Sequence, residues 1–187
     1  ANPSAVPLKV YVPYSTTNAN KTITPGLLVT SGESGDVQLG TAGDDEYRGN
    51  GGNDSFDAGA GNDSLDAGTG NDTIAAGTGN DTVLGGTGND VIYGGTLASP
   101  DAQGSGNDVI DSGEGNDVVY AGDGADSVTA GTGADTVYAG AGDDTVESGD
   151  GNDSVLAGDG NDSVLGGSGD DTVSSGAGND SVDAGIG

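Results

Sequence analysis

A short polar–apolar unit repeats along most of this chain. An apolar side chain recurs every nine residues, first as Tyr47, Phe56, Leu65, Ile74 and Val83, and polar or very small residues fill the positions between them. Each apolar residue has small or β-branched neighbours, which favours a very short strand. Glycines fill much of the rest of the unit and favour tight turns, because glycine tolerates positive φ. The pattern therefore predicts one strand and one turn in every nine residues.

An aspartate stands two residues before each apolar side chain, and a glycine stands two residues before each aspartate. Successive aspartates are nine residues apart, with a single interval of eighteen between Asp90 and Asp108. The aspartates of this column are Asp45, Asp54, Asp63, Asp72, Asp81, Asp90, Asp108, Asp117, Asp126, Asp135, Asp144, Asp153, Asp162, Asp171 and Asp180. Three columns that stay in phase over roughly 140 residues identify a repeat protein.

Two such units make one eighteen-residue coil, and coils of this kind stack in a parallel ladder with a spacing of about 4.8 Å. We therefore expect an all-β fold, a right-handed parallel β-roll (β-solenoid) with two sheets of short strands and with turns on both edges. The apolar residues would point between the sheets and form a narrow core. About eight coils would make a rod on the order of 38 Å long.

The first part of the chain differs from the repeats. Residues 1–39 hold four of the five prolines and two of the three basic residues, and we expect an N-terminal cap, the end of a preceding domain, or a linker. Candidate strands here are Leu8–Val12 and Ile23–Thr30, and Val37 with Leu39 would form an imperfect first strand.

The β-roll itself is expected to span residues 40–187. Within it, the segment 95–103 (GTLASPDAQ) is interpreted as a degenerate unit that takes the place of one motif without shifting the register. Ser99 would then stand where the missing aspartate belongs.

The composition raises the question of what makes such a chain compact. The net charge is −28, the hydrophobic fraction is 31%, the aromatic fraction is 4%, and the chain contains no cysteine. The core must therefore be thin, and no disulfide can support it. A composition of this kind normally indicates disorder, because self-repulsion opposes folding. A cation that neutralises the charge would remove this obstacle.

Calcium is the cation that fits these residues best. Aspartates eighteen residues apart, such as Asp63 and Asp81, would lie above one another on the same edge, where uncompensated carboxylates repel. Calcium accepts six to eight oxygen ligands in flexible geometry, whereas magnesium prefers a stricter octahedron and keeps its water. Zinc and copper favour His or Cys ligands, and the chain contains neither residue.

The repeat resembles the motif GGxGxDxUx of the RTX ("repeats in toxin") family. It occurs here as GGTGNDVIY from Gly85 and as GGSGDDTVS from Gly166, and the resemblance covers residues 40–187. In that family the motif forms a β-roll, with calcium held between same-side turns by Asp carboxylates and backbone carbonyls. The resemblance implies that the fifteen aspartates named above are metal ligands. Counting same-edge pairs then gives about twelve calcium ions, with two weaker sites between Asp81 and Asp117.

Other functional classes fit the residues less well. Without His and Cys, the usual acid–base, nucleophile and zinc arrangements of enzymes are missing. Equivalent carboxylates also argue against a catalytic pair, which needs two different environments, so we do not expect an enzyme. No glutamate completes an EF-hand loop. Three basic residues exclude nucleic acid and an anionic membrane surface as partners, and no apolar run is long enough for membrane insertion.

Residues three positions after each aspartate should point outward. On one sheet these would be Leu84, Ala102, Tyr120, Tyr138 and Leu156, and on the other Asp57, Ala75, Tyr93, Asp111, Thr129, Glu147 and Leu165. The first set predicts an apolar stripe. It indicates either lateral self-association or a surface partner through Leu84, Tyr120, Tyr138 and Leu156, or simply the strand preference of exposed Tyr and Leu.

The sequence is best interpreted as a calcium-binding structural repeat module, disordered at low intracellular calcium and rigid outside the cell. The resemblance implies type I secretion from a Gram-negative bacterium and an extracellular or cell-surface location, within a surface-layer (S-layer), adhesin, toxin or exoenzyme parent. One alternative is a calcium-dependent ice-binding or adhesin segment, because Thr69-Gly70-Asn71 and Thr78-Gly79-Asn80 resemble ice-binding rows, although Glu114 and Asp123 interrupt them. Another is a non-catalytic accessory module of a secreted enzyme.

Overall fold

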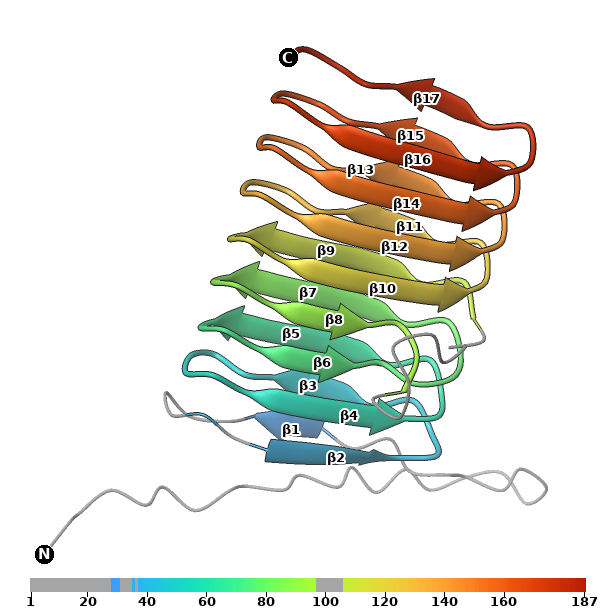
Figure 1. Ribbon diagram of the computed structural model, residues 1–187. Coiled ribbons are helices and arrows are strands. Elements are labelled where there is room, and N and C mark those ends of the chain that lie inside the picture. The colour runs from blue at the N-terminus through green and yellow to red at the C-terminus, as the bar shows by residue number, and fades with distance from the viewer. Residues whose placement is uncertain (1–27, 31–34, 36, 97–105) are drawn as a thin grey trace, which may run out of the picture.

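Short parallel strands make up the fold of this chain in the computed structural model, which describes residues 28–30, 35, 37–96 and 106–187. Successive strands alternate between two sheets, so that the chain winds upward in stacked coils (Figure 1). The described residues contain no helix, and hence none that could cross a membrane. The expected all-β, two-sheet β-roll is thereby confirmed.

The two sheets contain nine and eight strands. The nine-stranded sheet consists of β1 (Leu28–Thr30), β3 (Glu46–Arg48), β5 (Ser64–Thr69), β7 (Thr82–Thr87), β9 (Val109–Glu114), β11 (Ser127–Thr129), β13 (Thr145–Glu147), β15 (Ser163–Leu165) and β17 (Ser181–Asp183). The eight-stranded sheet consists of β2 (Val37–Thr41), β4 (Ser55–Gly59), β6 (Thr73–Ala75), β8 (Val91–Tyr93), β10 (Val118–Asp123), β12 (Thr136–Ala141), β14 (Ser154–Asp159) and β16 (Thr172–Ala177).

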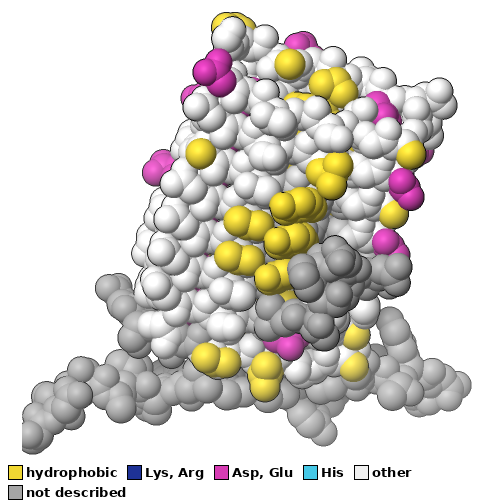
Figure 2. Space-filling model, viewed as in Figure 1, with side chains coloured by type: hydrophobic (Ala, Val, Ile, Leu, Met, Phe, Trp, Pro, Cys, Tyr) yellow, Lys and Arg dark blue, Asp and Glu magenta, His cyan; other side chains and the backbone are white. Residues whose placement is uncertain are grey.

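Each strand pairs in parallel with the strand one coil away, and nearly all pairs are offset by eighteen residues. Val119 on β10 faces Val137 on β12, and Val128 on β11 faces Val146 on β13. Side chains alternate along each strand, because successive residues of a strand point to opposite faces. The residues one and three positions after each aspartate therefore lie on the outer faces. Figure 2 shows the outer face of the eight-stranded sheet.

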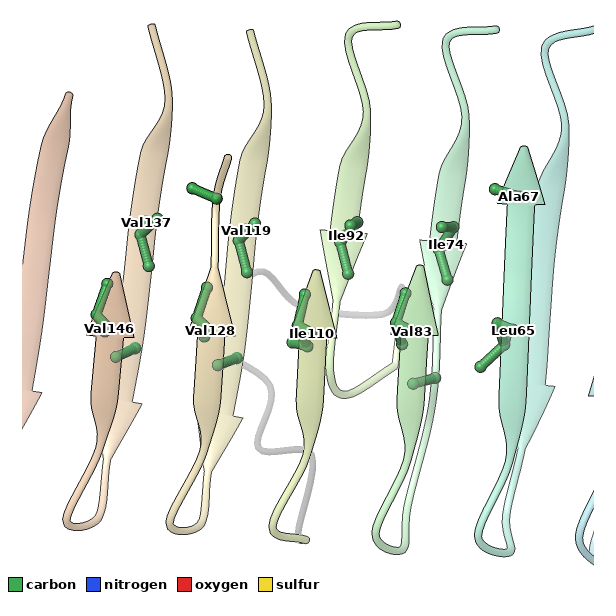
Figure 3. Packing of buried hydrophobic residues seen from close by; sticks show 14 of the residues in the cluster. Leu65, Ala67, Ile74, Val83, Ile92, Ile110, Val119, Val128, Val137 and Val146 are labelled. Carbon is green, nitrogen blue, oxygen red and sulfur yellow. The ribbon is translucent and has the colours of Figure 1, made fainter. Parts of the chain in front are cut away.

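The core is a narrow stack of apolar side chains between the two sheets. The residue two positions after each aspartate is buried from Tyr47 through Val164, which confirms the predicted apolar column. Figure 3 shows Val83, Ile110 and Val128 of one sheet facing Ile92 and Val119 of the other. The two largest rings, Tyr47 and Phe56, pack together with their centroids 5.6 Å apart.

A second column of small residues completes the core. Five residues before every aspartate except Asp108, the motif has Gly, Ala or Ser. Several of these side chains are fully buried, including Ala58, Ala67, Ala76, Ala121, Ala130, Ala139, Ala157, Ser112 and Ser148. The sequence shows these positions as departures from the glycine of the motif. The structure shows that a methyl or hydroxymethyl group fits there and fills interior space.

The first coil is imperfect, as the sequence predicts. Strand β2 pairs with β4, but Gln38 occupies the interior position, while Val37 and Leu39 are 79% and 70% exposed. Strand β1 lies within the predicted strand Ile23–Thr30 and pairs with β3. The other predicted strand, Leu8–Val12, lies outside the described residues.

The stacking between β8 and β9 corrects the predicted register. Strand β9 pairs directly with β7, and β10 pairs directly with β8, each with an offset of 27 residues, as in Thr82 with Val109 and Val91 with Val118. The nine extra residues therefore contribute no unit to the stack, although the sequence predicts one at 95–103. Every later strand consequently lies on the opposite sheet from the one expected.

The residues of the extra segment explain why it does not act as a unit. If Ser99 stood in the aspartate column, Pro100 would open the strand and Asp101 would take the core position. Proline cannot donate a ladder hydrogen bond, and an unpaired buried carboxylate is costly. Gly94 takes the first position of the next unit instead: a Cβ there would lie 2.7 Å from Oδ2 of Asp108, close to the 2.8 Å found at Gly85 and Asp90.

Candidate metal centre at the two edges

Two columns of aspartates run along the two edges of the roll. In thirteen successive pairs, the backbone N–H of one aspartate donates to Oδ1 of the aspartate in the next coil, over 2.7–3.1 Å. One column is Asp45, Asp63, Asp81, Asp108, Asp126, Asp144, Asp162 and Asp180. The other is Asp54, Asp72, Asp90, Asp117, Asp135, Asp153 and Asp171. All fifteen candidate ligands thus belong to one of two ladders.

The columns continue across the extra segment without a break. Asp81 N–H donates to Asp108 over 2.9 Å, and Asp90 N–H donates to Asp117 over 2.8 Å. The sequence-based expectation that Asp81 and Asp117 share an edge, with Ser99 between them, is therefore wrong. The physical reason is that β9 stacks directly on β7 and β10 directly on β8, with no coil between them. Seven aspartate pairs lie on one edge and six on the other, where the sequence indicates seven and five.

These carboxylates are almost completely buried. From Asp45 to Asp162, every aspartate of the two columns is at most 3% exposed. Burial, together with the neighbouring carboxylates, raises the pKa of Asp63, Asp90 and Asp135 to about 6, against the opposing effect of the backbone hydrogen bond. The same causes raise the pKa of Asp108 and Asp144 to about 7. Burial of two rows of charged carboxylates is therefore unfavourable, and a bound cation would offset this free-energy cost.

The second carboxylate oxygen of these residues is the strongest indication of a ligand. While Oδ1 accepts the backbone hydrogen bond, Oδ2 is buried and has no hydrogen-bond partner among the described residues in Asp63, Asp72, Asp81, Asp90, Asp126, Asp135, Asp144, Asp162 and Asp171. Buried polar atoms are normally satisfied, so each exception calls for an explanation. A row of anionic oxygens that all lack a partner in the same way fits metal binding.

Backbone carbonyls lie close to the same carboxylates. A Cβ added at Gly151 would collide with the carbonyl oxygen of Gly133 and lie 3.1 Å from Oδ1 of Asp153. A Cβ at Gly85 would lie 2.5 Å from the carbonyl oxygen of Ser112 and 2.8 Å from Oδ2 of Asp90. Carboxylate and carbonyl oxygens are the ligands that calcium prefers, so the residues present fit this ion.

Glycine is required where the turns stack. Gly88 has a φ of +126°, and a Cβ there would collide with the carbonyl of Gly70 in the adjacent coil. Asn50 has the only positive φ of a non-glycine residue in the described part of the chain, at 66°, and asparagine tolerates this conformation better than most residues. The close approach of the turns keeps carbonyl oxygens and carboxylates together.

No three acidic side chains of the described residues converge on one point. A site in this roll therefore differs from a carboxylate cluster: each aspartate pair would supply charge, and backbone carbonyls would supply the remaining oxygens. This composition suits a flexible, oxygen-rich coordination shell better than a strict octahedron.

A second, exposed ladder runs beside the aspartates. The residue just before each aspartate is usually Asn, and its Oδ1 accepts the backbone N–H of the equivalent residue one coil later, as between Asn62 and Asn80 over 2.9 Å. Eleven such bonds occur among the described residues. The sequence analysis did not assign a role to this position. Its signal was present, because Asn or Asp stands there in thirteen of the fifteen units, with Ala125 and Ala134 as the exceptions.

Two serines add hydroxyl groups next to one of the columns. Ser112 Oγ donates to the carbonyl of Ala130 over 2.9 Å, and Ser148 Oγ donates to the carbonyl of Gly166 over 2.7 Å. Both side chains are fully buried. The two serines stand five residues before Asp117 and Asp153, at the position that is a small residue in the other units.

Comparison with known proteins gives one family match. The sequence model of the RTX calcium-binding nonapeptide repeat, which comprises four copies of the unit, matches residues 39–74, 66–96, 104–128, 120–155 and 156–187. No curated protein matches the chain. The only gap after residue 39, residues 97–103, falls within the segment that adds no unit to the stack.

Proposed function

Because the chain belongs to the RTX calcium-binding nonapeptide repeat family, whose repeats bind calcium, we propose that its two aspartate ladders hold calcium ions between successive coils and that this binding drives folding. The observation that carries the proposal is the row of buried Oδ2 atoms without partners. At Gly85 and Gly166, a carbonyl oxygen of the adjacent coil and Oδ2 of Asp90 or Asp171 lie against the same backbone position. The fifteen aspartates of the two columns would be the side-chain ligands. Bound calcium would supply the positive charge that the chain lacks.

The number of aspartate pairs sets the expected number of ions. With one ion for each of the thirteen pairs, about 26 positive charges would face the net charge of −28. This replaces the sequence-based figure of about twelve, which assumed a different edge assignment across residues 95–103. Neutralisation on this scale explains how a strongly acidic chain with a thin core becomes compact.

RTX repeats are typical of secreted bacterial proteins, and the β-roll is a structural repeat fold. We propose a non-catalytic module that is exported in the unfolded state by type I secretion from a Gram-negative bacterium and folds outside the cell, where calcium is abundant. A surface-layer or adhesin parent agrees best with the apolar side chains on one outer face. Carboxylates of Glu114 and Asp150 flank Thr132 in one row of turn residues, so no uniform ice-binding row supports the ice-binding alternative.

The test is a calcium titration followed by far-UV circular dichroism, with magnesium as the control ion. We expect a cooperative and reversible transition from coil to β-structure with calcium, and little change with magnesium at the same concentration. Isothermal titration calorimetry on the same samples should give about thirteen ions per chain. A spectrum of β-structure that persists after removal of calcium by a chelator would disprove calcium-driven folding.

A further inference from the structure

The two outer faces of the roll differ sharply in charge. On the eight-stranded sheet, the residues one and three positions after each aspartate include a single charged side chain in β2 to β16, Asp57. On the nine-stranded sheet, the same positions of β3 to β17 carry Glu46, Arg48, Asp66, Asp111, Glu147 and Asp183. In a chain with a net charge of −28, one carboxylate among these positions is the exception. The other two acidic residues of this sheet, Asp123 and Asp159, are the last residues of β10 and β14.

A row of aromatic rings occupies the middle of the uncharged face. Tyr93, Tyr120 and Tyr138 stack on consecutive strands, with ring centroids 5.1 and 4.8 Å apart and ring planes within 5° of parallel. Leu156 follows in register after Tyr138. We call these four residues, together with Val91 and Val118 beside them, the tyrosine face. Figure 2 shows hydrophobic side chains gathered here over β8 to β14, with most carboxylates at the margins.

The direct stacking across the extra segment is what completes this row. The sequence predicts Leu84 in the same stripe as Tyr120, but Leu84 lies on the other sheet, in register with Asp111. Tyr93 takes its place, because β8 pairs directly with β10. Tyr138 and Leu156 are 38% and 43% exposed, so the continuous row presents apolar surface to solvent.

We propose that the tyrosine face binds the tyrosine face of a second copy of this chain, giving a calcium-dependent dimer that rests on the proposed calcium-driven folding. Carboxylates outside the two ladders keep their charge when calcium is bound, so two copies repel wherever these carboxylates meet, and the tyrosine face carries few of them. A positively charged partner would meet few carboxylates on this face. The same patch on both copies is self-complementary in charge, as a twofold interface requires.

The shape of the face also fits a second sheet. The rings of Tyr93 and Tyr138 stack on the two faces of the Tyr120 ring, so neither plane of that central ring is open to a flat ligand. Two sheets of this kind pack face to face at about 10 Å. The whole outer face of the eight-stranded sheet, with the tyrosine face at its centre, covers an area on the order of 600 Å² per copy, at about 4.8 Å between strands and about five residues per strand. This area is near the lower end of specific interfaces, so the dimer should be reversible.

The test is sedimentation velocity of the full chain in millimolar calcium over a range of protein concentrations. We expect a concentration-dependent dimer for the native chain and a monomer for Tyr138→Lys, because two ammonium groups would meet at the interface and calcium cannot bridge them. Leu156→Lys serves as a second variant in case the first does not fold. The matched control is Thr129→Lys, which places the same charge at the same position of the unit on the opposite sheet and should still dimerise.

Far-UV circular dichroism of each sample separates this proposal from the proposed function. If the native chain shows the calcium-dependent β-spectrum but stays monomeric at every concentration, the dimer is disproved and calcium-driven folding stands. Equal dimerisation by the native chain and both variants on the tyrosine face, or loss of the dimer in Thr129→Lys as well, would also overturn the proposal.

Discussion

At the scale of single residues, one aspartate carboxylate has two different tasks. Oδ1 of Asp135 accepts the backbone N–H of Asp117 over 2.8 Å and joins two coils, while its Oδ2 is buried without a partner. The first task needs only an oxygen acceptor, and an asparagine would perform it. The second needs negative charge if a cation is bound. The two tasks can therefore be separated by substitution.

We predict that Asp135→Asn folds at a higher calcium concentration than the native chain and binds one or two fewer ions. Asn keeps an oxygen for the coil-to-coil hydrogen bond but removes charge from the two positions between Asp117, Asp135 and Asp153, which should raise the calcium midpoint on the order of several-fold. Calorimetry and calcium-dependent circular dichroism measure both effects. The control is Asp143→Asn, an exposed residue whose Oδ1 accepts from Asn161; an equal effect there would show that net charge alone matters.

The raised pKa values predict how the metal-free chain responds to acid. The pKa is about 7 for Asp108 and Asp144 and about 6 for Asp63, Asp90 and Asp135 in the folded chain, against about 3.9 in an unfolded chain. The folded state therefore binds protons more tightly. Its stabilisation by protons is complete below about pH 4 and is lost as the pH rises to about 7.

Acidification should consequently replace part of the effect of calcium. In the presence of a chelator, we expect β-structure to increase as the pH falls from about 8 to about 5, still above the sequence pI of about 4.1. Circular dichroism during a pH titration measures this change. A metal-free spectrum that stays constant over the whole range would contradict it. Calcium binding should weaken over the same range, because protons compete for the carboxylates.

At the scale of strands and turns, the repeat length of nine residues decides what an added segment does to the stack. A strand and turn of nine residues move the chain from one sheet to the other, so two units restore the starting sheet. An inserted segment of nine residues leaves the stack in register, as the direct pairing of β7 with β9 and of β8 with β10 shows. The segment 95–103 is thus an insertion within one unit.

Much of this architecture can be predicted from the sequence, because every unit carries the same three columns. The core residues, the two sheets and the two rows of aspartates follow from the spacing alone. The assignment of Leu84 and Tyr120 to one sheet failed, because a count of residues cannot tell a degenerate unit from an insertion. The cost of Pro100 and Asp101 in a strand is the signal that would have separated the two. The interior position of Ala67 was also missed, since a small residue fits both turns and cores.

Deletion of residues 95–103 should leave the roll intact. The new junction joins Gly94 to Gly104 and restores a complete unit, GGSGNDVID, so we expect the native number of calcium ions and an unchanged calcium midpoint. The matched control removes nine residues that do form a unit, 126–134. That deletion should remove one aspartate pair from the ladders. It should also place Tyr138 and Tyr120 on different sheets. Calorimetry distinguishes the two variants, and a lower ion count for the first deletion would contradict the insertion.

At the scale of the whole molecule, the roll is a column in which each coil contacts only its neighbours. Its stability is therefore close to a sum of coil-to-coil terms. With calcium bound between the coils as proposed, its removal should weaken all of these terms together. Small-angle X-ray scattering should show the radius of gyration falling from roughly 46 Å, the value for an unfolded chain of this length, towards roughly 16 Å as calcium is added. A compact chain in chelator would contradict this expectation.

The parallel register also determines how the molecule would respond to a pulling force. Hydrogen bonds between coils run along the column, so a pull on its two ends loads the coils in series and should peel them off one at a time. Each coil of eighteen residues would release about 60 Å of chain, while the coil that contains the insertion spans 27 residues and would release about 90 Å. An optical-tweezers record in calcium should therefore show uniform steps and one longer step. The roll would act as an extensible tether whose strength is set by the surrounding calcium concentration.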